Sequence, residues 1–372
     1  MYLKSSFAED IVREIVDLEM SDNEAVMILL AVEGQTDVDE LIRQLNYHGI
    51  DFFGGIFPGL IHGTKVHHSG AVVQKFPLIE KPILVKGLDS QDFGIPPFEG
   101  KILENTSKKN TLMILLDGMT ENITQLLHRT FNSLGNSVNY IGAGAGFLQV
   151  ERNPCVFTPA GLFQDAAIIV PIGMESGLGV HHGLEFISGP IIVTKSNNHV
   201  IQELNWKNAY QEYKDTIEKA MGEKWNDDEF SELIENFSFG IYCEDREYIA
   251  RVPARVTENG ELICPGGMPE NAALSILRSE SKKMLQAASK AAKEAIHPKT
   301  KARNTLVVEC LGRYNFLGNE FNAELSSIAR ELKKVDEKVI PEGILSVGEI
   351  SSYQDGILEF FNCTVVVGRF YE

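Results

Sequence analysis

Two charged residues, Arg313 and Glu349, stand in otherwise apolar segments of this 372-residue sequence. Arg313 closes the segment NTLVVECLGR, three residues after Cys310, and Glu349 follows Gly348 in the segment GILSVGEIS. A guanidinium binds a carboxylate or a phosphate through two parallel hydrogen bonds, and a carboxylate binds an ammonium group. Because a charge in apolar surroundings needs a partner, we expect each residue to bind a ligand or to pair with the other.

These residues belong to a larger candidate site for a ligand. Its expected members are Arg313, Glu349, Cys310, Asn362, His182 and Gly348. Cys310 and Arg313 come at the end of a predicted strand, where α/β proteins tend to place their sites, and Asn362 precedes the last predicted strand. Structural interpretations stay open beside this one: Cys310 as a small buried filler, Arg313 in an internal ion pair, and Asn362 in a turn.

Catalysis and metal binding find less support in the residue pattern. Cys310 with His182 is the one nucleophile–base pair that the sequence offers, and no local signature of a catalytic family surrounds it. The five cysteines are scattered without a C-x-x-C motif, and adjacent His181 and His182 face opposite sides of a predicted strand. We therefore expect no metal, no cofactor and no catalytic residue. An enzyme that uses Cys310 as its nucleophile is the alternative.

The segment YIGAGAGFLQ, residues 140–149, imitates a dinucleotide-binding turn. Such a turn needs a helix directly after it, so that the helix N-terminus faces the phosphates. Here Pro154, Pro159 and Gly161 follow, which favour short extended pieces. No G-x-x-x-x-G-K-[ST] motif occurs either. The sequence predicts that neither NAD nor ATP binds, and that these glycines serve close backbone packing.

Charge and hydropathy exclude two classes of partner. The net charge of −18 disfavours nucleic acid, which requires clustered Lys and Arg. No segment approaches the apolar run that a membrane helix needs. The first twenty residues are charged and lack the apolar centre of a signal peptide, so we expect a cytoplasmic protein.

Three segments, residues 25–76, 111–172 and 305–370, share one pattern. Each begins with an apolar strand and continues through an amphipathic helix, a second strand with a glycine-rich corner, and a closing extended pair. One such unit cannot bury its sheet alone. The pattern predicts an α+β fold with α/β-like repeats: extended mixed sheets flanked by helices, in two pseudo-related halves. A polar, acidic stretch after residue 222 suggests domains at residues 1–222 and 223–372.

Several sequence segments, taken in their order along the chain, resemble the FIST family, in both its N-terminal and C-terminal domains. They are GAGAG, HHGLEFISGPIIVTK, NTLVVECLGR, GILSVGEIS and FFNCTVVVG. The resemblance extends from about residue 25 to residue 370. It departs from the family at the H-G-W position, which reads His182, Gly183 and Leu184 here.

The resemblance implies an intracellular sensory module for a small ligand, with an amino acid as the suggested class. An amino acid offers a carboxylate and an ammonium, which Arg313 and Glu349 would match in opposite senses. The first repeat starts near residue 25 and the last ends near residue 370, so we expect the signal to pass through a separate protein partner. A scaffold subunit with an empty pocket is a further alternative.

Overall fold

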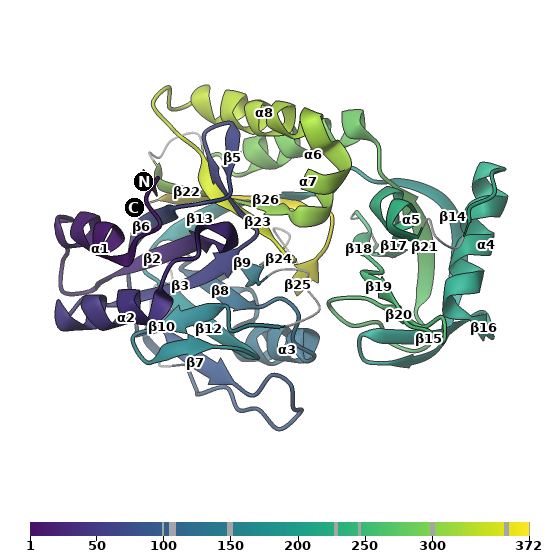
Figure 1. Cartoon of the computed structure of the whole chain (residues 1–372), viewed down its shortest axis with the longest axis horizontal. Helices are drawn as coiled ribbons and strands as arrows, with labels where there is room; N and C mark the ends of the chain where they lie inside the picture. The colour runs from purple at the N-terminus through teal and green to yellow at the C-terminus, as the bar shows by residue number, and fades with distance from the viewer. Residues whose placement is uncertain are drawn as a thin grey trace.

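The computed structural model describes residues 1–98, 100–103, 109–146, 152–226, 230–244, 247–297, 302–352 and 357–371. Figure 1 shows a large body beside a smaller lobe. The body consists of three six-stranded sheets and their helices, and the lobe carries the remaining sheet, formed by strands between residues 185 and 278. Both chain ends lie on the body, on the side away from the lobe (Figure 1).

The three sheets of the body follow one design. The first has the order β1 (Tyr2–Leu3), β6 (Ala71–Pro77), β2 (Glu24–Ala31), β3 (Phe52–Phe57), β10 (Val156–Thr158) and β11 (Gly161–Phe163). The second has the order β7 (Ile83–Lys86), β12 (Ala166–Ile172), β8 (Thr111–Asp117), β9 (Asn139–Ala145), β24 (Glu349–Ser352) and β25 (Leu358–Phe361). The third has the order β13 (Glu175–His181), β26 (Val365–Tyr371), β22 (Ala302–Cys310), β23 (Glu342–Ser346), β4 (Gly59–His62) and β5 (Lys65–His67).

Each sheet contains a parallel pair of strands that a helical crossover connects. The pairs are β2 with β3, β8 with β9, and β22 with β23. The crossovers contain α2 (Val38–Tyr47), α3 (Ile123–Leu134), and α7 (Leu311–Leu317) followed by α8 (Phe321–Lys333). Short 3-10 turns at Val32–Gly34, Gly100–Leu103, Gly135–Ser137 and Gly318–Glu320 complete the helical elements of the body's loops. The three repeats thus share one strand order.

A hairpin from each repeat joins the sheet of another repeat. Hairpin β10–β11 of the second repeat pairs with β3 of the first, and β24–β25 of the third pairs with β9 of the second. Hairpin β4–β5 of the first repeat pairs with β23 of the third. The exchange therefore closes on itself, and no repeat completes its sheet without a neighbour.

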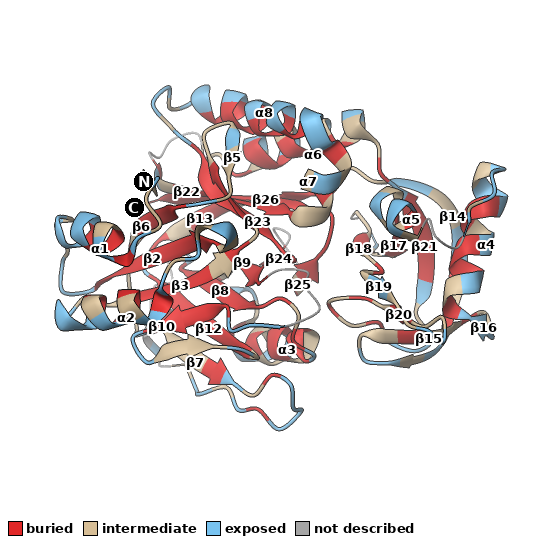
Figure 2. Cartoon of the chain, in the orientation of Figure 1, coloured by how far each residue is buried: buried red, intermediate tan, exposed pale blue. Residues whose placement is uncertain are grey.

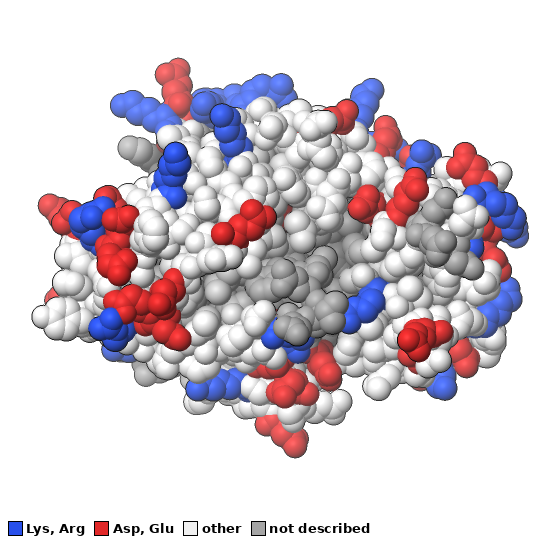
Figure 3. Space-filling model, in the orientation of Figure 1, with Lys and Arg blue, Asp and Glu red and all other residues white. Residues whose placement is uncertain are grey.

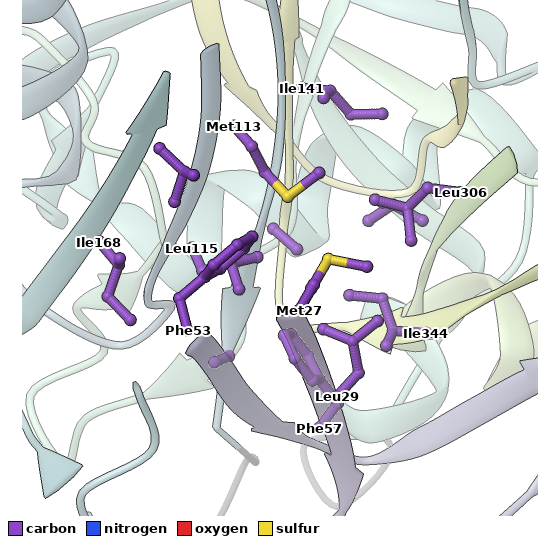
Figure 4. Packing of buried hydrophobic residues seen from close by; sticks show 14 of the residues in the cluster. Met27, Leu29, Phe53, Phe57, Met113, Leu115, Ile141, Ile168, Leu306 and Ile344 are labelled. Carbon is purple, nitrogen blue, oxygen red and sulfur yellow. The ribbon is translucent and has the colours of Figure 1, made fainter. Parts of the chain in front are cut away.

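One core lies between the inner faces of the three sheets. Figure 4 shows Met27 and Phe53 of the first sheet against Met113 of the second and Leu306 and Ile344 of the third. All five are at most 1% exposed. The outer faces are covered by α1 (Ala8–Val16) and α2, by α3, and by α6 (Ser281–Glu294) with α7 and α8. Most strands of the body appear buried along their length in Figure 2, whereas the edge strands β5 and β7 are partly exposed and the helices expose one side.

The lobe is an antiparallel sheet with two helices around its own core. Its elements are β14 (Glu185–Asn197), β15 (Val200–Leu204), β16 (Lys207–Asn208), β17 (Phe237–Ile241), β18 (Ile249–Arg251), β19 (Arg255–Val256), β20 (Leu262–Ile263), β21 (Ala273–Arg278), α4 (Ala209–Met221) and α5 (Phe230–Asn236). Helix α4 packs on this sheet through Tyr213 and Ile217, both fully buried.

The predicted fold class, an α+β protein with mixed sheets flanked by helices, is confirmed. The GAGAG segment forms the end of β9, and the described residues after it continue into β10 and β11 rather than into a helix. The domain boundary expected at residue 222 follows α4 and stays a prediction. Among the described residues, no helix has the length and apolarity needed to cross a membrane.

Glycine is required at the same place in all three repeats. Gly54, Gly142 and Gly343 each pair with a residue of the parallel neighbour strand. A Cβ at these positions would lie 2.1, 2.0 and 1.8 Å from the carbonyl oxygen of that neighbour. Close approach of two strands therefore explains the glycine at these three positions, whereas Gly146 at the end of the GAGAG segment has a φ of +102°.

We predict that Gly142→Ala lowers the free energy of unfolding by about 1–3 kcal/mol, because the added methyl group forces β9 away from β8. Gly94→Ala is the matched control: Gly94 is exposed, and a Cβ there has nothing within 4 Å. Urea unfolding of both variants measures the difference. Equal stability of the two variants would contradict this role of the glycine.

Candidate functional site

Arg313 lies at the centre of a buried polar cluster where the body meets the lobe. It is 0% exposed. Its Nε and Nη2 donate to the two carboxylate oxygens of Glu324, at 3.0 and 2.8 Å. Nη1 donates to the carbonyl oxygens of His182 (2.6 Å) and Cys363 (3.0 Å), and Nη2 also donates to that of Met284 (3.1 Å). All five N–H groups of the guanidinium are thereby used.

A second carboxyl group shares the charge of Arg313. Glu309 Oε2 lies 3.3 Å from Arg313 Nε, and both residues are fully buried. Burial, and then the nearby carboxylate of Glu324, raise the pKa of Glu309 well above its usual range. Burial opposes the charge of Arg313, yet Glu324 and Glu309 outweigh it and raise the arginine's pKa. The cluster therefore holds the ion pair of Arg313 with Glu324 beside Glu309, whose neutral form is favoured by burial.

The expected pair of Arg313 with Glu349 is wrong. Glu349, at the start of β24, accepts hydrogen bonds from Ser346 Oγ (2.5 Å) and from the backbone N–H of Thr364 (3.1 Å). Burial raises its pKa well above the usual range. Arg313 pairs with Glu324 instead, because α8 packs beside α7 and presents this carboxylate to the Nε–Nη2 edge of the guanidinium.

Three other predicted residues have partners within the same junction. Asn362 accepts from the N–H of Val252 in the lobe (3.2 Å), so it connects body and lobe. Gly348 leaves room for a ring, since a Cβ there would lie 2.0 Å from Phe360 Cζ. The Cys310 thiol is hydrogen-bonded to the thiol of Cys363, and this bond together with burial raises the pKa of Cys310.

His182 is buried, and its ring is neutral. Burial lowers its pKa to about 4. Its Nδ1 accepts from the N–H of Leu184 (2.7 Å), so the proton resides on Nε2, which has no hydrogen-bond partner among the described residues. The described contacts of His182 do not include the Cys310 thiol, so they give the proposed nucleophile–base pair no support.

The structure thus gathers the predicted residues Arg313, Glu349, Cys310, Asn362 and His182 around one junction. Arg313 has no N–H group left for a ligand in this arrangement. A role of these residues in ligand binding stays a prediction, and a role in joining α6, α7, α8 and the lobe follows from the contacts.

The adjacent His181 acts as a clamp between two carboxylates. Its Nδ1 lies 2.9 Å from Glu247, between β17 and β18 of the lobe, and its Nε2 lies 2.8 Å from Glu294 of α6. Burial opposes the charged ring, but the two carboxylates outweigh burial and raise the pKa of His181. Glu247 also accepts from the N–H of His182, and its pKa is lowered to about 2 by these partners in spite of burial.

An open cavity of about 520 Å³ lies beside this cluster, between the body and the lobe. It is lined by Thr124, His128, Ser196, Asn198, Ile241, Ile249, Arg251, Gly266, Gly267, Met268, Pro269, Glu270 and Glu359. Helix α3 and strand β25 supply the wall on the body side, and the lobe supplies the remainder. Figure 3 shows the surface hollowed where the two parts meet, with acidic and basic side chains interspersed on both.

Arg251 is the charged residue at the base of this cavity. It is 3% exposed, and its Nη1 donates to the carbonyl oxygens of Phe360 (2.6 Å) and Ala250 (3.1 Å). Its Nη2 lies 3.8 Å from Glu359 Oε2 and makes no hydrogen bond within the described part of the chain. Burial lowers the pKa of Arg251 and raises that of Glu359, whose charge Arg251 and His128 partly restore. Arg251 therefore keeps an available donor, unlike Arg313.

The sequence analysis missed Arg251, Glu359 and His128. The criterion that singled out Arg313 and Glu349, a charge within an apolar strand, also fits Arg251 in YIARVPARV and Glu359 in ILEFF. What the sequence lacks is a sign that β18 and β25, more than 100 residues apart, meet at one cavity.

Comparison with protein-family models matches residues 83–207 to the FIST N domain and residues 209–352 to the FIST C domain. Among curated proteins, no match is found. The two family matches cover the second repeat, the lobe and the third repeat as far as residue 352, and so include every residue of the cavity lining except Glu359.

We predict that Arg313→Met lowers the free energy of unfolding by about 3–5 kcal/mol without any ligand present, because it strands the buried carboxylate of Glu324 and three carbonyl oxygens. Arg330→Met, at an exposed position of α8, is the matched control and should change stability by less than about 0.5 kcal/mol. Chemical unfolding measures both. A stable Arg313→Met variant would show that the ion pair is dispensable.

The His181 clamp predicts a pH-dependent stability. Its pKa in the folded chain is raised, so its contribution is complete below the unfolded value of about 6.5 and is lost as pH rises through the folded value. The stability difference between the wild type and His181→Gln should therefore be largest below about pH 6.5 and shrink above it. Glu247 stays charged and His182 neutral over this range.

Urea unfolding at a series of pH values tests the clamp. His48→Gln, at an exposed position, is the control and should follow the wild-type profile. A pH-independent difference between the wild type and His181→Gln would show that the imidazole acts by packing alone.

Proposed function

Because the chain belongs to the FIST family, with a FIST N domain followed by a FIST C domain, we propose that it senses a small molecule and signals through a protein partner. FIST domains are associated with sensory roles in signal transduction. The observation that carries the proposal is the cavity between body and lobe, with the available donor of Arg251 at its base.

An amino acid is the ligand class that fits this cavity best. Its carboxylate would accept from Arg251 Nη2, and its ammonium would face Glu359, with Glu270 also on the wall. The two charges of an amino acid are close together, as are Arg251 and Glu359, whose 3.8 Å contact is longer than a hydrogen bond. Ile241, Ile249 and Met268 offer an apolar surface for the ligand's side chain.

Ligand binding there would act on the arrangement of the two parts. Hydrogen bonds already cross between body and lobe near the cavity, among them Thr124 Oγ1 to the carbonyl oxygen of Gly266 (2.5 Å), Asn198 Nδ2 to that of Glu121 (2.7 Å) and Arg251 Nη1 to that of Phe360 (2.6 Å). A ligand that contacts both sides stabilises the closed arrangement by its differential affinity for it. An intracellular protein partner that recognises the closed arrangement would receive the signal.

We predict that Arg251→Met weakens amino-acid binding about ten- to a hundredfold, the equivalent of one charge-assisted hydrogen bond of about 1.5–3 kcal/mol. Titration calorimetry over the set of natural amino acids, after a thermal-shift survey, measures it. Arg255→Met is the matched control, since Arg255 is exposed and lies outside the cavity lining. Unchanged affinity in Arg251→Met would contradict the site.

Glu359→Gln tests recognition of the ligand's ammonium group separately from recognition of its carboxylate. It preserves size and leaves Arg251 in place, so it should weaken binding of the amino acid but not of the corresponding carboxylic acid without the amino group. Equal losses for both compounds would place the ammonium elsewhere. Absence of saturable binding by any amino acid to the wild type would overturn the proposed ligand class.

A further inference from the structure

Two thiols lie against each other at the junction of body and lobe. Cys310 ends β22 and Cys363 precedes β26, the antiparallel neighbour of β22, and the N–H of Cys310 donates to the carbonyl oxygen of Thr364 (3.3 Å). A Cβ placed on Gly312 would lie 3.6 Å from the Cys310 Sγ and 3.7 Å from the Cys363 Sγ. The two sulfur atoms therefore flank the same point beside Gly312, and each thiol shifts the pKa of the other.

The surroundings give the two thiols different properties. Ser238 Oγ of the lobe lies 3.6 Å from Cys363 Sγ, so two hydroxyl or thiol groups surround this sulfur. The hydrogen bond from Cys310 lowers the pKa of Cys363, while the same bond and burial raise that of Cys310. The lowered pKa of Cys363 favours it over Cys310 as the attacking thiolate.

The backbone of Cys363 has an uncommon conformation. Its φ is +53°, in the left-handed region that residues with a Cβ rarely adopt. Its carbonyl oxygen accepts from Arg313 Nη1, which fixes the turn. Such positions persist where surrounding contacts hold them, and they occur often at reactive sites. Here the turn carries the Cys363 thiol to the end of β22.

We propose that Cys310 and Cys363 are a site of reversible oxidation, at which a hydroperoxide converts the two thiols into a disulfide. The Cys363 thiolate attacks the O–O bond, forms an S–O bond and releases the alkoxide or hydroxide, which takes up a proton. The Cys310 thiol then attacks the sulfur of this sulfenic acid; the S–S bond forms, the S–O bond breaks and water leaves. One hydroperoxide is reduced by two electrons while the two thiols are oxidised by two. A low-molecular-weight thiol restores the dithiol.

The disulfide would alter the contact between the two parts of the molecule. In the dithiol, the Cys363 sulfur faces Ser238 of β17 in the lobe. A bond to Cys310 turns that sulfur toward β22 and removes the Ser238 contact. The oxidation would therefore act at the same junction that carries the Arg313 cluster, independently of any ligand in the cavity.

Mass spectrometry of the intact full-length chain after mild hydrogen peroxide treatment tests the proposal. A Cys243→Ser background removes the half-buried cysteine, whose own oxidation would confuse the result. We expect the loss of two hydrogens, reversed by dithiothreitol, and a proteolytic peptide pair that links residues 310 and 363. Cys310→Ser should instead accumulate a sulfenic acid on Cys363 that dimedone traps, and Cys363→Ser should give no link.

Two further variants serve as controls. Cys155→Ser and Cys264→Ser each remove a buried thiol elsewhere and should leave the link unchanged. An unchanged intact mass under conditions that oxidise glutathione would overturn the proposal. A link that joins any other pair of cysteines, or a dimedone adduct on Cys310 rather than on Cys363, would overturn it as well.

Discussion

The exchange of hairpins among the three repeats is the constraint on which the rest of the body depends. Each sheet takes its last two strands from another repeat, so β3, β9 and β23 are paired on their second edge only when all three repeats are in place. The three inner faces then bury one continuous core, which no single repeat could enclose (Figure 4). Folding of the body is therefore expected to be cooperative across segments as distant in sequence as β4 and β23. Gly54, Gly142 and Gly343 permit the close strand packing that closure needs.

The lobe is inserted into this closed body and is held to it at both ends of the insertion. The chain leaves the third sheet after β13 and returns to it through α6, so the lobe is inserted within the third repeat's sheet. Buried polar groups make hydrogen bonds at both places where the chain passes between body and lobe. Arg313 bonds the carbonyl oxygen of His182 at the exit and that of Met284 at the return, and His181 is held between Glu247 of the lobe and Glu294 of α6. Since a buried charge is stable only with its partners, each of these contacts ties the position of the lobe to that of the helices.

The residues that could bind a ligand or react lie at the interface between body and lobe that this insertion creates. The cavity with Arg251 and Glu359 opens between lobe and body, and Cys310 and Cys363 lie at the same junction, where the Cys363 carbonyl oxygen accepts from Arg313. A ligand in the cavity and an oxidised thiol pair would both act on the same interface, through different atoms. For a sensor, a seam between a rigid body and an inserted lobe is a suitable place, because a small change in contacts there biases the relative position of two large parts.

The sequence by itself determined the elements and their repetition. Alternating apolar strands and amphipathic helices indicated the α+β fold, and Gly142 and Gly343 indicated close packing of strands. The sequence segments and their order indicated the FIST family. All of these depend on residues that are near one another in the chain. Only the tertiary structure decided which sheet each hairpin joins and which carboxylate meets Arg313. The residues of a strand do not specify which other strand pairs with its edge. Glu324 rather than Glu349 reaches the guanidinium of Arg313 because α7 and α8 pack side by side. The cavity at Arg251 likewise arises where β18 and β25 meet, and a meeting of distant strands leaves no local pattern in the sequence.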